Sequence, residues 1–239
     1  MKVDLGNVKA IVFDTFGTVV DWRSSIINDL SAWGGGRGLD ADWPKLVDRW
    51  RALYEPQKDR VRKGEIPWTN LDELHLDALK TLLPEIGLGG LRSDDISHIN
   101  KVWHRLKGWP EASQALVRLK SRFIIGPLSN GNVALLVDMA KHAGLPWDAI
   151  FSCELFRHYK PHPSTYLGVC QQLYLQPEEV MMCAAHNYDL RAARAVGLRT
   201  AFIPRPTEYG PGQTTDLSAE EDWDVVAKDL LEFASRMGT

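Results

Sequence analysis

Four short apolar runs punctuate the chain, each bounded by polar or turn-forming residues. They occupy residues 9–13, 123–125, 180–183 and 200–203. A continuous apolar run of this length is typical of a strand that is buried on both faces of a parallel sheet. Helix-like stretches are expected between and after these runs, at residues 111–120, 132–143, 164–173 and 190–196. This alternation predicts an α/β fold, a doubly wound parallel sheet that is covered by helices.

Residues 22–109 interrupt the alternation. Helices are expected there at residues 25–33, 43–63, 71–82 and 94–105, with no convincing strand. Seven of the nine tryptophans fall in this segment, where they form the core of a helical bundle or, in part, an apolar pocket that faces the sheet. The chain is therefore expected to contain an α/β core, residues 1–21 plus 110–239, and an inserted helical domain, residues 22–109. Leaving the sheet at the edge where ligands bind, the insert would cover the site like a lid.

Composition narrows the class of protein. With 239 residues, 44% of them hydrophobic, the chain can bury a core, which excludes a disordered or fibrous protein. A formal net charge of −3 leaves no basic excess, so no nucleic-acid partner is expected. No signal peptide and no run of 18 apolar residues is visible, so no membrane association is expected. Three cysteines without a CxxC pair are expected to be buried, reduced thiols, as in a cytoplasmic protein.

Polar residues follow the predicted strands at their carboxyl ends. Asp14 ends the first apolar run, and Ser129 and Asn130 follow the second. Lys160 precedes a proline, and Asp189 follows the run at 180–183. Because the carboxyl ends of parallel strands share one edge of the sheet, these side chains are expected to converge. A carboxylate, a hydroxyl, a lysine and a second carboxylate together indicate a site for nucleophilic catalysis.

Four segments carry a resemblance to a known family. They are Phe-Asp-Thr-Phe-Gly-Thr at 13–18, Leu-Ser-Asn-Gly at 128–131, Lys-Pro at 160–161, and Asp189. Together they resemble the four motifs of the haloacid dehalogenase superfamily, and the chain is most similar to its (S)-2-haloacid dehalogenases. The similarity runs nearly end to end and includes Trp50-Arg51 and Tyr166. It implies a Rossmann-like haloacid dehalogenase fold with an inserted helical cap domain.

The resemblance also implies a reaction. Asp14 would attack Cα of a small (S)-2-haloacid and expel halide, leaving an aspartyl ester that water hydrolyses to a 2-hydroxy acid. Lys160 would keep Asp14 ionised, and Asp189 would act as base or positioner for the water. The hydrogen bonds that orient Asp14 and the substrate carboxylate would come from Thr18, Ser129 and Asn130. The preferred halogen, fluoride included, stays open.

The candidate substrate-binding residues are Phe16, Arg51, Trp68, Asn130, Tyr166 and His186. Arg51 resembles the family's halide-binding arginine, and the alternative is a solvated helix residue. Tyr166 could equally be a packing residue. His186 stands where the family usually has asparagine, so it either donates a hydrogen bond to Asp14 or the water, or is an ordinary loop histidine.

No metal and no cofactor are expected. Phosphatases of this superfamily carry a second Asp two residues after the nucleophile, where this chain has Phe16, and Asp189 alone offers a poor Mg²⁺ site. His158 and His162 are expected to be surface residues rather than zinc ligands. Two alternatives remain: another hydrolase of the superfamily, such as a small-metabolite phosphatase, and a non-catalytic binding protein. A homodimer would be supported if the lid exposes aromatic side chains.

Overall fold

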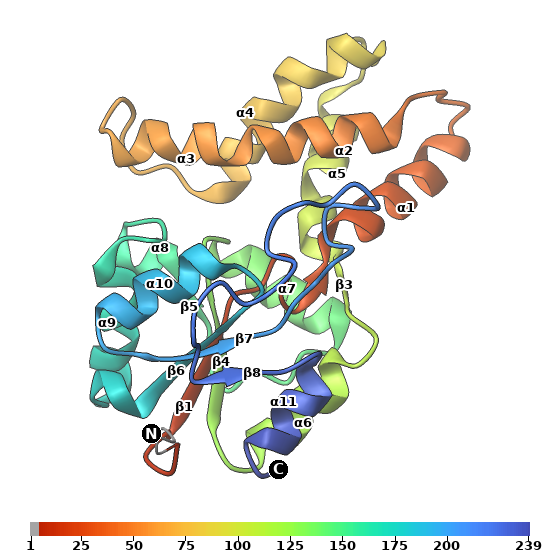
Figure 1. The fold of residues 1–239 in the computed structure, drawn as a ribbon. Helices are drawn as coiled ribbons and strands as arrows, with labels where there is room; N and C mark the ends of the chain where they lie inside the picture. Colours follow the sequence, from red (N-terminus) through yellow and green to blue (C-terminus); the bar gives the residue numbers. More distant parts are fainter. Residues whose placement is uncertain (1–4) are drawn as a thin grey trace.

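The computed structural model describes residues 5–239. Its core is a six-stranded sheet in the order β5-β4-β1-β6-β7-β8, in which every neighbouring pair is parallel (Figure 1). The strands are β1 (Ala10–Phe13), β4 (Ile124–Ser129), β5 (Phe151–Ser152), β6 (Val180–Ala184), β7 (Arg199–Phe202) and β8 (Val225–Val226). The predicted doubly wound parallel sheet is confirmed. The two-residue strands β5 and β8 were not predicted, because so short a strand has no apolar run of its own.

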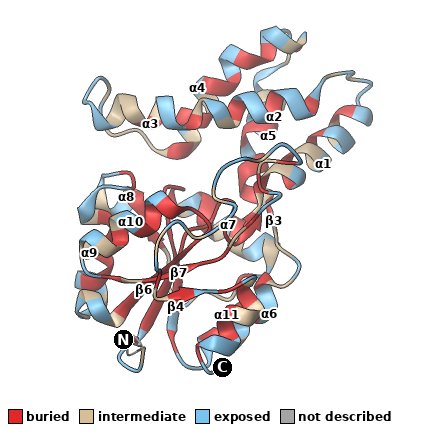
Figure 2. Cartoon of the chain, in the orientation of Figure 1, coloured by how far each residue is buried: buried red, intermediate tan, exposed pale blue. Residues whose placement is uncertain are grey.

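Alternate residues of the central strand β1 enter two different hydrophobic clusters, as the two-residue period of a strand requires. Ile11 and Phe13 pack on the side of α6, α7 and α11, whereas Ala10 and Val12 pack on the side of α9 and α10. These helices are α6 (Ala112–Lys120), α7 (Val133–Ala143), α9 (Pro163–Leu173), α10 (Asn187–Ala195) and α11 (Leu230–Arg236), with a short α8 (Cys153–Phe156) beside β5. The strands and the helix faces that pack on them are therefore buried, and the exposed residues lie on the outer faces of the helices (Figure 2).

Helices fill the segment between β1 and β4. They are α1 (Trp22–Gly35), α2 (Trp43–Ala52), α3 (Tyr54–Arg62), α4 (Leu71–Leu82) and α5 (Ser93–Asn100), followed by the 3₁₀ turn Lys101–Arg105. Helices α2, α3 and α4 lie over the core, beyond the carboxyl ends of its strands (Figure 1). A two-stranded antiparallel ladder, β2 (Val20–Asp21) with β3 (Lys107–Gly108), joins the start and the end of the helical segment.

The helical segment differs from the sequence-based expectation at several points. The helix expected at 94–105 ends at Asn100 and is followed by a 3₁₀ turn, and the two-residue strand β3 lies where no strand was expected. The single helix expected at 43–63 is wrong: the chain breaks at Leu53, between α2 and α3. Pro56 explains the break, because proline fits the first turn of α3 but would clash with a carbonyl inside a continuous helix. No large hydrophobic side chain of residues 22–109 is exposed, so the aromatic surface that would have supported a homodimer is absent there.

The tryptophans of the helical segment mostly form its core. Trp22, Trp50 and Trp103 are almost completely buried and pack against one another at ring-centroid distances of 5.5–6.1 Å. The three cysteines are buried and unpaired, as expected. Across residues 5–239, no helix is long and apolar enough to cross a membrane.

Candidate active site

Asp14 sits at the carboxyl end of β1 and is only 6% exposed. Its Oδ1 accepts a hydrogen bond from Lys160 Nζ at 2.9 Å, while Oδ2 lies 2.8 Å from Thr18 Oγ1 and 3.1 Å from His186 Nδ1. Burial alone would raise the pKa of Asp14, but the charges and hydrogen bonds of Lys160 and His186 lower it well below its usual value. Asp14 is therefore an ionised carboxylate in a nearly dry site.

Lys160 joins two carboxylates. Its ammonium group is completely buried and contacts both Asp14 Oδ1 and Asp189 Oδ2. Burial would lower the pKa of Lys160, but the charges of Asp14 and Asp189 raise it. The backbone N–H of Lys160 donates to Asn130 Oδ1 at 2.9 Å, which fixes the loop that carries the ammonium group. Lys160 therefore stays charged next to Asp14.

Asp189 lies in the first turn of α10 and is enclosed by neighbouring side chains. It is completely buried, one oxygen taking a hydrogen bond from Lys160 and the other from the hydroxyl of Tyr166 at 2.5 Å. Each oxygen keeps a further lone pair, but the carboxylate is enclosed and does not line the pocket where substrate and water would enter. The geometry therefore gives no support to Asp189 as the base for hydrolytic water, and it places Asp189 and Tyr166 behind Lys160, holding the ammonium group.

Ser129 and Asn130 follow β4 and are buried. The amide of Asn130 donates to the hydroxyl of Tyr54 on α3 at 2.9 Å, which ties the core to the helical segment. The hydroxyl oxygen of Ser129 accepts a hydrogen bond from the N–H of Gly131. Neither side chain has a hydrogen bond to Asp14, so Thr18 alone of the three predicted orienting residues contacts that carboxylate directly.

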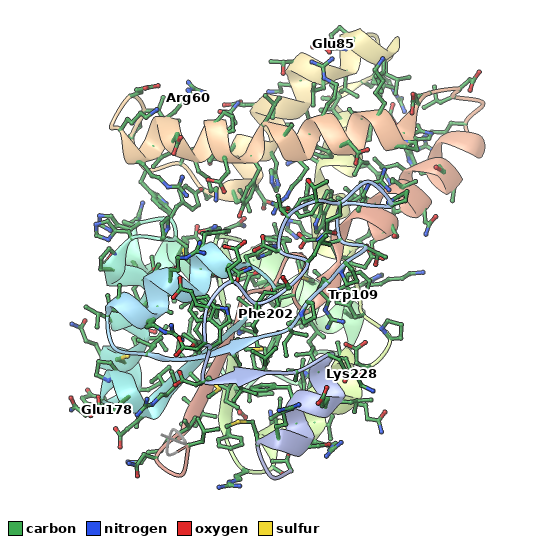
Figure 3. The ribbon with its side chains drawn as sticks, viewed as in Figure 1. Arg60, Glu85, Trp109, Glu178, Phe202 and Lys228 are labelled. Carbon is green, nitrogen blue, oxygen red and sulfur yellow. The ribbon has the colours of Figure 1, made fainter. Side chains whose placement is uncertain are left out.

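A pocket of about 600 Å³ opens between α2–α3 and the loops of the core. It is lined by Asp48, Arg51, Ala52, Tyr54, Glu55, Arg62, Pro161, Tyr188 and Tyr209. Side chains of the helical segment and of the core extend toward each other across this region. The labelled Arg60 lies near the outer end of α3 (Figure 3). Through Tyr54 and Asn130 the pocket adjoins the loop that carries Lys160.

Arg51 is held by aromatic rings rather than by carboxylates. Its guanidinium carbon lies 4.2 Å from the ring centre of Tyr54 and 5.2 Å from that of Trp22. Nη1 of Arg51 is enclosed and has no hydrogen-bond partner within residues 5–239. Arg51 is therefore not a solvated helix residue, and it brings a fixed positive charge with a free N–H donor to the pocket.

Two predicted substrate-binding residues lie elsewhere. Trp68 packs against Tyr159 with ring centroids 4.7 Å apart and the planes tilted by 31°, and it lines a separate pocket of about 410 Å³ beside His158 and His162. Phe16 is 3% exposed and packs edge-on against Trp103 at 5.7 Å. The structure thus gives Trp68 no place at Asp14, and it makes Phe16 part of the apolar packing between the core and the helical segment.

His186 is part of the site, and it brings a residue that sequence reasoning missed. The ring is 3% exposed, with Nδ1 on Asp14 and Nε2 at 2.9 Å from Glu208 Oε2. Glu208 is 1% exposed and accepts a second hydrogen bond from the indole of Trp22 at 2.9 Å. Gly17 leaves room for that carboxylate, since a Cβ at Gly17 would lie 2.2 Å from it. Nothing in the local pattern around Glu208 marks it, because it lies in an irregular loop.

The charge of His186 follows from these partners. Burial would lower its pKa, but Glu208 and Asp14 raise it well above 6.5. A neutral imidazole can donate from only one ring nitrogen, whereas here both nitrogens face carboxylates, as in imidazolium. Within residues 5–239, no group of three or more His, Cys, Asp or Glu side chains is arranged to hold a metal ion.

Known proteins resemble this chain over nearly its whole length. It is 29% identical to (S)-2-haloacid dehalogenase 4A of Burkholderia cepacia over 237 residues (95% of this chain, 99% of that protein), and 30% identical to (S)-2-haloacid dehalogenase 1 of Pseudomonas sp. strain CBS-3 (84% and 88%). Among solved structures, L-2-haloacid dehalogenase PA0810 is 52% identical with a TM-score of 0.92 (97% of this chain, 100% of that chain). The defluorinating L-2-haloacid dehalogenase Rha0230 is 45% identical with a TM-score of 0.94 (97% and 96%).

A family model for haloacid dehalogenase-like hydrolases matches residues 8–197, which contain every motif on which the resemblance was drawn. The match includes both the strands of the core up to β6 and the helical segment between β1 and β4. The chain belongs to the haloacid dehalogenase-like hydrolases.

Proposed function

We propose that this protein hydrolyses small (S)-2-haloalkanoic acids to 2-hydroxy acids through an ester on Asp14. The observation that carries the proposal is the combination of a buried, ionised Asp14 with a guanidinium, that of Arg51, whose Nη1 has no hydrogen-bond partner, at the adjoining pocket. Relatives named (S)-2-haloacid dehalogenase, similar over 84–95% of this chain, support the same substrate class.

In the first step, Asp14 attacks Cα of the substrate in line with the carbon–halogen bond. Oδ1 has one hydrogen-bond donor and Oδ2 has two, so Oδ1 keeps the freer lone pair for the attack. A carboxylate stripped of water is a stronger nucleophile, and Lys160 keeps it ionised without protonating it. The departing halide would be stabilised by the positive charge of Arg51 and by a hydrogen bond from its free N–H donor.

In the second step, water attacks the carbonyl carbon of the ester and restores Asp14. Phe16 suits this chemistry, since a halide leaves as a stable anion and needs no acid at that position. A phosphatase, by contrast, must protonate an alkoxide and neutralise phosphate charge with a metal ion. The apolar packing of Phe16 against Trp103 leaves no proton donor there.

We also propose fluoroacetate as a substrate, supported by the 45% identity to the defluorinating L-2-haloacid dehalogenase Rha0230. Residues 22–109 would act as the cap over a core of residues 5–21 and 110–239; residues 1–4 of the expected core lie outside the described residues. The hydrogen bonds from Asn130 to Tyr54 and from Arg62 to the carbonyl of Lys160 support closure of that cap over the site.

The buried, unpaired cysteines agree with a cytoplasmic protein.

The test is a screen for halide release with chloro-, bromo- and fluoroacetate and with both enantiomers of 2-chloropropionate, in the presence of EDTA. We expect release from the haloacetates and from the (S) enantiomer alone. Asp14→Asn should abolish it. Release of phosphate from phosphorylated metabolites, dependent on Mg²⁺ and without any halide release, would overturn the proposal in favour of a phosphatase.

A further inference from the structure

The two oxygens of Asp14 are held differently. Once Oδ1 carries the substrate carbon, Oδ2 becomes the carbonyl oxygen of the ester, and it already lies between Thr18 Oγ1 and His186 Nδ1 at 2.8 and 3.1 Å. The hydroxyl of Thr18 accepts the N–H of Ala185 at 2.8 Å, which leaves its single proton for Oδ2. Two donors thus converge on the atom where negative charge develops during ester hydrolysis.

We propose that Thr18 and His186 form an oxyanion site for hydrolysis of the aspartyl ester, and that Glu208 is the positioning residue that keeps His186 doubly protonated. This inference rests on the function proposed above and assigns residues to its second step.

Glu208 is needed because Asp14 loses its charge when it becomes an ester. In the free enzyme His186 has two anionic partners, and in the ester form only Glu208 remains to hold its proton. Glu208 is fixed by the indole of Trp22 and almost completely enclosed, so its charge acts on His186 at low dielectric. The other charged or titratable groups nearby are Arg51, which acts on Glu208, and Tyr188, whose ring centre lies 5.8 Å from that of His186.

Water adds to Cγ, and the electron pair of the C=O bond moves to Oδ2, between Thr18 and His186. The C=O bond then re-forms, the Cγ–Oδ1 bond breaks, and Oδ1 leaves in the 2-hydroxy acid. Lys160, whose Nζ faces Oδ1 at 2.9 Å, gives the departing alkoxide a proton and regains one that the water has lost. The second proton of the water passes to solvent as Asp14 returns to a carboxylate.

The alternative role for His186 is that of a general base, which would have to be neutral before it could take a proton from water. The two roles respond to pH with opposite signs. If imidazolium is the active form, removing Glu208 lets His186 lose its proton near neutral pH, and ester hydrolysis slows as the pH rises. If the neutral ring is the active form, hydrolysis becomes faster as the pH rises.

The experiment follows halide release and the mass of the ester-bearing enzyme in rapid-quench reactions of the wild type, Glu208→Gln and His186→Asn with chloroacetate. In Glu208→Gln we expect a retained burst of halide, accumulation of the carboxymethyl ester, and hydrolysis slowed on the order of 10²-fold. The slow step should decline further above about pH 6.5, the ordinary pKa of histidine. His186→Asn should hydrolyse the ester without dependence on pH in this range and faster than Glu208→Gln above pH 6.5, because an amide donor, the group that the family usually has here, does not titrate.

Glu179→Gln is the matched control, since Glu179 forms an ion pair with Lys9 ahead of β1, away from the site. The oxyanion assignment is overturned, while the proposed function stands, if ester hydrolysis in Glu208→Gln is unchanged, is slowed no more than alkylation, or rises with pH. If Glu208→Gln does not fold, His186→Leu decides: without a donor at this position, ester hydrolysis should slow relative to alkylation, and an unchanged ratio overturns the assignment. Absence of halide release and of any ester in the wild type would instead refute the proposed function.

Discussion

Replacement of Arg51 by methionine tests whether the guanidinium contributes to the rate of the reaction rather than to the stability of the fold. Methionine keeps the unbranched stem and loses the guanidinium. If the guanidinium meets the leaving halide, it acts on charge that is present only in the transition state, so kcat should fall and KM should change little. Loss of one such donor typically lowers kcat by about 10²–10³, or about 2.7–4 kcal/mol. Lysine should rescue poorly, because a flexible point charge does not reproduce the planar fork.

The stability of the same variant is expected to fall only modestly. Two cation–π contacts would be lost, at 4.2 Å from Tyr54 and 5.2 Å from Trp22, each contributing about 0.5–2 kcal/mol. Against this, the variant no longer buries Nη1 without a hydrogen-bond partner, which costs about 1–3 kcal/mol. The variant also loses the attraction between the guanidinium and the buried carboxylate of Glu208, so the balance is a modest loss of stability and the melting temperature should fall by a few degrees.

The assay is steady-state halide release from fluoro-, chloro- and bromoacetate, with thermal unfolding measured on the same preparations. The loss in kcat should be largest for the poorest leaving group that the enzyme accepts, and smallest for bromide. Near-native turnover of chloroacetate by both Arg51→Met and Arg51→Lys would refute the reasoning. So would a uniform loss across halogens that tracks a large fall in melting temperature.

Three further predictions concern the nucleophile, a backbone position and a buried histidine. In a single turnover with excess enzyme in ¹⁸O water, mass spectrometry should find the label in Asp14 and little in the 2-hydroxy acid. The reason is that attack of water at the ester carbonyl transfers an Asp14 oxygen to the product. Full labelling of the product would instead indicate direct attack by water. Gly17→Ala should lower the melting temperature, because Gly17 has φ +89° and a Cβ there would overlap the Glu208 carboxylate. Gly35→Ala is the control: a Cβ at that position would have no other atom within 4 Å, so the variant should be neutral or stabilising in the same thermal scan. Burial lowers the pKa of His75 to about 3, so the folded protein binds fewer protons than the unfolded chain between pH 6.5 and 3, and stability falls as the pH falls through that window. His75→Phe should remove this component, and denaturant unfolding should show the variant gaining on the wild type by about 1.4 kcal/mol per pH unit below 6.5; parallel pH profiles would contradict it.

Local patterns determined the architecture of the core. The apolar runs that end at Phe13 and at Cys183 identify central strands, because a strand buried on both faces needs apolar residues at every position. The same reasoning places Asp14 and Asn130 at the carboxyl edge, since the direction of a parallel strand decides which end its loop occupies. Arg51 was a candidate because of a motif, not because of its burial, which no local pattern reports.

Tertiary structure decided which polar groups meet and what each can do. Asp14 and His186 are 172 residues apart, and Glu208 enters from a loop without periodicity, so no spacing in the sequence predicts that the three form one chain of hydrogen bonds. Asp189 shows the same limit: its position after a strand was predictable, but only packing against Tyr166 turns its carboxylate toward Lys160 and away from water. Periodicity reports which face of an element is buried, whereas the contacts of a buried side chain depend on residues brought together by the whole fold.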